Sequence, residues 1–146
     1  MRILTLVSAL ALSFSVAAGA PTSPITHPDG WDSQIKLREA VDLNPAPNVV
    51  EITLEARVAR TRLSDKQEVE AFTYDGGLPG PLIRIQVGSR LIVHFKNSLP
   101  IPTTVHWHGV RVPIEMDGVP GISQPEVLTG ESFTYDFIVP DAGLFW

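Results

Sequence analysis

The stretch IRIQVGSRLIVHFK, Ile83 to Lys96, predicts two β-strands joined by a short turn at Gly88 and Ser89. Apolar side chains recur at every second position on both sides of the turn, at Ile83, Ile85, Val87, Leu91, Val93 and Phe95. Alternation with a period of two is typical of a strand that buries one face and exposes the other. We therefore expect strands over residues 83–87 and 91–96.

The same alternation recurs elsewhere in the chain. It predicts further strands at Val49–Arg57, Val69–Tyr74 and Phe133–Val139, and a turn block over Asp75–Pro81, where glycine and proline interrupt regular structure. No segment shows a helical period. Short strands separated by Gly/Pro turns are typical of an all-β sandwich or barrel, and we expect an antiparallel Greek-key arrangement.

The N-terminus, Met1 to Ala18, has the order of a secretory signal peptide. Arg2 precedes an uncharged apolar run over residues 3–16, and small residues follow, so we expect cleavage after Ala18 or Ala20 and an extracytoplasmic protein, periplasmic or secreted. The alternative is a buried N-terminal helix. The apolar run is too short for a membrane span, which needs about 20 residues. Residues 19–48 are expected to form an extended arm, ahead of one domain over residues 49–146.

Composition limits the classes of partner. The chain has 146 residues, 44% of them hydrophobic, which suffices for one domain with a real core. The net charge is −5 and no Lys/Arg cluster is present, so nucleic acid and anionic membranes are not expected partners. There is no cysteine, so the domain is stabilised by its core and not by disulfides.

The segment TTVHWHGV, Thr103 to Val110, places two of the four histidines one residue apart. On a strand, His106 and His108 would project from one face and Trp107 from the other. Two such imidazoles can bind one metal ion or two adjacent ones, and imidazole suits copper, zinc, iron and nickel. The alternative is a pair of exposed strand histidines without a ligand role.

Two known His-x-His contexts disagree with the surrounding residues. A cupin would need a glycine at the position of Pro100 and a glutamate at Val112 or Pro113. An alpha-type carbonic anhydrase would need a third histidine downstream, and no histidine follows His108 in these 146 residues, so this context would require a ligand beyond Trp146.

Several ordered motifs agree with a third context. They are Pro79-Gly80-Pro81, Asn97 with Leu99, His106-Trp107-His108-Gly109, Met116-Asp117-Gly118 and Gly143-Leu144-Phe145-Trp146. Through these motifs, residues 76–146 closely resemble the first cupredoxin domain, also called plastocyanin-like, of the laccase-like multicopper oxidase family. The resemblance covers about half the chain and is far more specific than a lone His-x-His.

The resemblance implies a cupredoxin-like Greek-key fold and copper chemistry. His106 would bind the type 2 copper and His108 one type 3 copper of a trinuclear centre, which is completed by residues outside this segment. Electrons from phenols, aromatic amines or metal ions would enter at a type 1 copper in a later domain, and dioxygen would be reduced to water. Asp117 matches a family acid that assists proton delivery. It could equally be a turn residue that caps the Asp117-Gly118 bend.

The segment departs from the family pattern at its end. The second histidine pair, the later cupredoxin domains and the cysteine of a blue copper site do not follow Trp146, so we expect a truncated and inactive segment of a longer oxidase. The alternative is a non-enzymatic exported module, either a copper binder or an interaction protein. A mononuclear blue-copper carrier is excluded because it needs a thiolate. His27, His94 and Glu115 are expected to have no ligand role.

Overall fold

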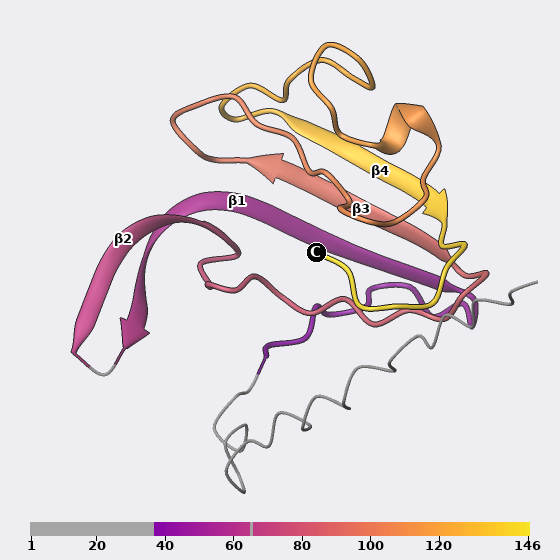
Figure 1. Ribbon diagram of the computed structural model, residues 1–146, viewed down its shortest axis with the longest axis horizontal. Coiled ribbons are helices and arrows are strands. Elements are labelled where there is room, and N and C mark those ends of the chain that lie inside the picture. Colours follow the sequence, from indigo (N-terminus) through magenta and orange to yellow (C-terminus); the bar gives the residue numbers. More distant parts are fainter. Residues whose placement is uncertain (1–36, 65) are drawn as a thin grey trace, which may run out of the picture. The chain divides into compact units, whose positions relative to one another are not determined.

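The computed structural model describes residues 37–64 and 66–146, and within them the chain forms one four-stranded sheet (Figure 1). The expected signal peptide and most of the expected arm lie outside the described residues. The elements are β1 (Val49–Ser64), β2 (Gln67–Tyr74), β3 (Arg90–Asn97), the short 3-10 helix η1 (Ile114–Met116) and β4 (Ser132–Ile138). The prediction of an all-β fold is confirmed. No helix in this part of the chain is long and apolar enough to cross a membrane.

The strand order is β2-β1-β3-β4. β1 runs antiparallel to β2 and parallel to β3, and β3 runs antiparallel to β4. The sheet is therefore mixed, whereas the sequence predicted an antiparallel arrangement. β1 is longer than expected because its first half pairs with β3 and its second half with β2. Figure 1 shows β1 curving away from β3 where it joins β2.

The predicted alternation places one face of the sheet in the core. Ile52 of β1 lies beside Val93 of β3, which lies beside Tyr135 of β4, and all three are almost fully buried. The rest of the core has the same spacing or comes from the connecting segments: Leu54, Ala56, Leu91, Phe95, Leu99, Val105, Val127, Phe137 and Val139. Core and outer face are therefore separated as the sequence predicts.

The strand expected at residues 83–87 is not formed. Ile83 and Ile85 do pack against the core, as their alternation predicts. However, no ladder contact falls within this segment; the bridge nearest to it joins Leu82 to Glu39, and the Leu82 N–H donates to the Arg38 carbonyl at 2.8 Å. Alternation reports which face of an extended segment is buried, whereas a strand also needs a neighbouring backbone to pair with.

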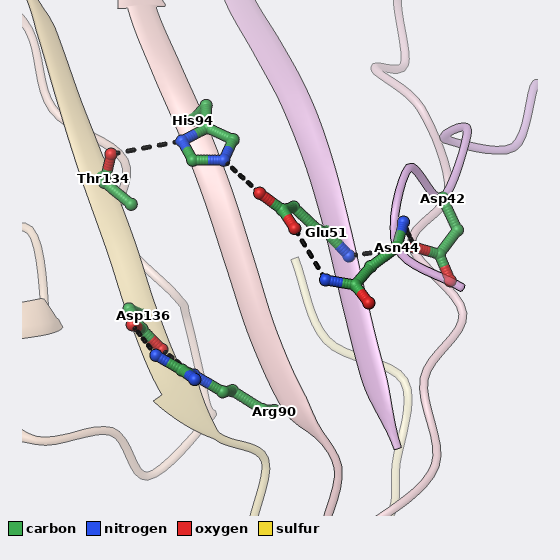
Figure 2. Close-up of polar contacts among 7 residues, drawn as sticks. All are labelled: Asp42, Asn44, Glu51, Arg90, His94, Thr134 and Asp136. Atoms are coloured by element: carbon green, nitrogen blue, oxygen red, sulfur yellow. Dashed lines mark hydrogen bonds and ion pairs between the residues drawn. The ribbon is translucent and has the colours of Figure 1, made fainter. Parts of the chain in front are cut away.

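The outer face of the sheet carries a polar network centred on His94 (Figure 2). His94 Nε2 lies 2.7 Å from Glu51 Oε1 on β1, and Nδ1 lies 3.3 Å from the Thr134 hydroxyl on β4. The Asn44 amide donates to the other Glu51 oxygen at 2.8 Å. His94 thus lies on the exposed face, as expected, and the network joins the segment before β1 to the sheet.

Candidate metal centre

The histidine motif lies on the connection between β3 and η1 and not on a strand, so that expectation was wrong. Thr103 still pairs with Val127, but the following residues pair with no strand, and the chain turns at His108 and Gly109. The Val110 N–H donates to the Trp107 carbonyl at 3.1 Å and closes this turn. Gly109 has a φ of +88°, a conformation that glycine adopts without steric cost.

The expected division of side chains is nevertheless preserved. Trp107 packs inward, edge-on against Tyr135 at 5.6 Å and Phe137 at 5.3 Å between ring centroids. His106 and His108 are exposed on the other side, with their ring centroids 6.0 Å apart. An extended backbone suffices for this division, because successive side chains point to opposite sides with or without a ladder. The partly buried tryptophan therefore anchors the connection that presents both imidazoles.

A main-chain oxygen determines which ring nitrogen of His106 carries the proton. Its Nδ1 lies 2.7 Å from the Asp117 carbonyl, which can only accept a hydrogen bond, so Nδ1 must carry the proton. The Asp117 carboxylate, with Oδ1 at 3.4 Å from the same nitrogen, favours the same assignment. In the neutral imidazole, Nε2 is then left with a free lone pair, which is the form that binds a metal.

A tight turn brings Asp117 to His106. The Asp117 N–H closes η1 by donating to the Ile114 carbonyl at 3.2 Å. Gly118 follows at a φ of +72°, and a Cβ built there would lie 1.8 Å from the Val105 carbonyl oxygen. No other residue allows the two segments to approach so closely.

His108 is held by contacts that the sequence alone did not indicate. Its ring stacks on the Trp146 indole, with centroids 4.8 Å apart and planes 11° apart. Its backbone N–H donates to the Trp146 carbonyl at 2.8 Å. In the sequence, Trp146 stands out only as part of a motif. No spacing rule connects it with His108, because the two residues are far apart along the chain.

An ion pair links the same two segments. Arg111 donates to both carboxylate oxygens of Asp141 at 2.8 and 2.6 Å. The guanidinium lowers the pKa of the Asp141 carboxyl, chiefly through these hydrogen bonds. Glu115 is exposed, as expected.

The donor set fits part of a copper site. Both imidazoles are exposed side by side, and one has its Nε2 free. Across residues 37–64 and 66–146, no group of three or more His, Cys, Asp and Glu side chains is placed to surround a metal ion. The pair would therefore supply some of the ligands, and the remainder would come from elsewhere.

Comparison with known proteins agrees with this chemistry. The family model described as "Multicopper oxidase" matches residues 55–146. The chain is 36% identical to Multicopper oxidase MmcO of Mycobacterium tuberculosis over 137 residues, which cover 94% of this chain and 27% of that protein. It is also 36% identical to Laccase-1 of Cryptococcus neoformans var. grubii over 117 residues, covering 78% of this chain and 19% of the relative.

A solved structure shares the fold. The crystal structure of a multicopper oxidase from Pseudomonas thermotolerans has a TM-score of 0.64 and 44% identity, covering 67% of this chain and 24% of that one. The chain thus spans about a quarter or less of the length of these proteins. The family match extends over more than half of the chain and includes both motif histidines, and the chain belongs to the multicopper oxidase family.

Proposed function

We propose that this chain is the first cupredoxin domain of an oxidase that couples one-electron oxidation of a reducing substrate to four-electron reduction of dioxygen to water. The observation that carries the proposal is the exposed pair His106 and His108, one of which has a free Nε2 because a main-chain carbonyl holds its other nitrogen. Family membership supports the choice of copper over the other metals that imidazole binds.

The two histidines would hold different ions of a trinuclear centre, His106 the type 2 copper and His108 one type 3 copper. Bound copper supplies the one-electron redox chemistry that carries electrons to dioxygen. The remaining ligands of the centre, and a type 1 copper site, would belong to other cupredoxin domains of the same polypeptide. The Asp117 carbonyl orients the His106 ring toward its metal by holding the Nδ1 proton.

The Asp117 carboxylate would handle protons for the reaction. Reduction of dioxygen to water consumes protons, and a carboxyl group near the metal can take up a proton and then deliver it as a general acid. Asp117 suits this role because its side chain is about one-third exposed and its Oδ1 lies 3.4 Å from the His106 ring. It can therefore exchange protons with solvent while remaining beside the copper ligand.

Phenols, aromatic amines and reduced metal ions are the substrate classes that the resemblance implies. The leader-like residues 1–18 support an extracytoplasmic location, with residues 19–48 as an arm and residues 49–146 as the domain.

The test is copper content and dioxygen consumption of the protein that carries this chain together with its other domains. His106→Ala and His108→Ala should each lower copper content and abolish dioxygen consumption. His94→Ala is the matched control, because His94 is exposed on the outer face of the sheet, and it should leave both unchanged. Copper binding without dioxygen consumption in the unmodified protein would support the non-enzymatic module. Full activity in either motif variant would contradict the proposal.

A further inference from the structure

Residues 141–146, here called the C-terminal strap, contact residues 106–111, here called the histidine loop. The contacts occur at three points. The first is the stack of Trp146 on the His108 ring, combined with the hydrogen bond from the His108 N–H to the Trp146 carbonyl. One face of the imidazole is therefore covered by a planar side chain, and the backbone that carries it is fixed at the same place.

The second contact lies one residue later in the loop and one residue earlier in the strap. Phe145 lies over Gly109, where a built Cβ would come within 3.2 Å of the phenyl ring. A side chain on residue 109 would thus meet the strap as well as strain the backbone. The absence of a side chain lets the strap lie close to the loop.

The third contact is the paired hydrogen bonds of Arg111 with Asp141. The Arg111 side chain is 78% exposed, and exposed ion pairs contribute little to overall stability. Their two-point geometry still restrains orientation, because a planar guanidinium and a carboxylate meet in one arrangement. This pair therefore fixes the beginning of the strap relative to the loop.

The two motif histidines are held by different means. The His106 ring is fixed by a hydrogen bond from Nδ1. Among the described residues no hydrogen bond engages a ring nitrogen of His108, so its ring is restrained only by stacking. We propose that Trp146, Arg111 and Asp141 are positioning residues that hold the His108 imidazole in one orientation for its copper. This inference rests on the proposed function for the identity of the ligand.

The stack can be tested in the copper-free 146-residue chain by NMR. The ring current of the indole should shift the carbon-bound ring protons of His108 upfield, and His108→Ala identifies these signals by their loss. Trp146→Phe should keep most of the shift, whereas Trp146→Leu should remove it. Trp146 is 81% exposed, so neither change disturbs the core. Unchanged shifts in Trp146→Leu would overturn the proposal.

The ion pair offers a second, independent test by charge exchange. Arg111→Asp and Asp141→Arg should each reduce the shift and weaken Cu(II) binding about two- to fivefold, the range expected for an exposed pair. The double variant should restore both. The control is Arg90 with Asp136, which has the same two-point geometry at 2.7 and 2.5 Å on β3 and β4 (Figure 2). Exchanging the control pair should change neither readout. Equal effects in both pairs, or no recovery in the double variant, would overturn the proposal.

Failure of the proposed function is distinguishable from failure of this inference. If His108→Ala binds Cu(II) as tightly as the unmodified chain, the copper assignment is wrong, and with it the positioning role. If His108→Ala loses affinity but Trp146→Leu and the charge-exchange variants do not, the copper assignment holds and the strap has no positioning role.

Discussion

At the scale of single residues, the ring of His106 is oriented by an atom that no side-chain pattern reveals. The sequence indicates the histidine and its neighbour Trp107, and their opposite directions follow from the extended backbone. The holding atom is the carbonyl of Asp117, and it reaches His106 only because Gly118 allows the turn to approach Val105. Side-chain identity could be predicted from the sequence, whereas this main-chain contact depends on tertiary packing.

The two proposed roles of Asp117 give a prediction for the complete oxidase. Asp117→Asn keeps the main-chain carbonyl, so copper content should remain near normal. It removes the ionisable group, so turnover should fall by about 100- to 10,000-fold, the usual range for a lost general acid or base. Copper analysis and dioxygen uptake measure the two effects.

The matched control is Glu115→Gln, two residues away and exposed, which should leave turnover unchanged. Full turnover in Asp117→Asn would remove the proton-delivery role. Loss of copper would instead assign the carboxylate to supporting the His106 ring.

At the scale of elements, the loop that carries the histidines is fastened to β4. The Val105 N–H donates at 2.8 Å to the hydroxyl of Tyr135, which is fully buried. Tyr135→Phe would leave that N–H without its partner inside the protein, at a cost of about 1–3 kcal/mol in unfolding free energy. Denaturant titration measures the loss.

Tyr74→Phe is the control for this change. Tyr74 is half-buried, and its hydroxyl makes no hydrogen bond with the described residues, so the change should cost clearly less. Equal losses in the two variants would show that the Val105 bond does not fasten the loop.

The His94 network on the outer face gives a pH prediction. Hydrogen bonds from His94 and Asn44 lower the pKa of Glu51 below its ordinary value of 4.5. The ionised form therefore stabilises the fold, with a contribution that is fully present above pH 4.5 and lost as the pH falls through the lowered pKa. Glu51→Gln should reduce the fall in Tm between pH 6 and pH 3.

Glu126→Gln, an exposed carboxyl outside the network, should leave the acid response unchanged. Asp42, Asp136 and Asp141 also have lowered pKa values, so part of the acid response persists in every variant. An unaltered acid response in Glu51→Gln would contradict the assignment to Glu51.

Strand prediction succeeded where alternation coincides with a neighbouring backbone. β3 and β4 agree with the predicted segments within one or two residues. The segments at 83–87 and around His106 form no strand, because sequence alternation does not report the presence of a partner backbone. The parallel pairing of β1 with β3 depends on chain topology, which local pattern does not determine.

At the scale of the whole molecule, the ordered motifs allowed the family to be predicted because they include residues that build the site. The chain has only four histidines, and His94 lies on the outer face of the sheet, where it contacts Glu51. His27 lies outside the described residues. The described residues hold no group of three or more metal-binding side chains. We therefore expect the 146-residue chain alone to bind copper weakly and to oxidise no phenolic substrate.

The most direct test of the central claim is pulsed EPR of Cu(II) bound to the 146-residue chain, which counts coordinated imidazoles through their remote nitrogens. In the chain alone, without the ligands that other domains would supply, one Cu(II) would be shared by both rings, so we predict two imidazoles in the unmodified chain and in the control His94→Ala. His106→Ala and His108→Ala should each leave one. An unchanged count in either motif variant, or a loss in His94→Ala, would show that copper binds elsewhere and would contradict the account.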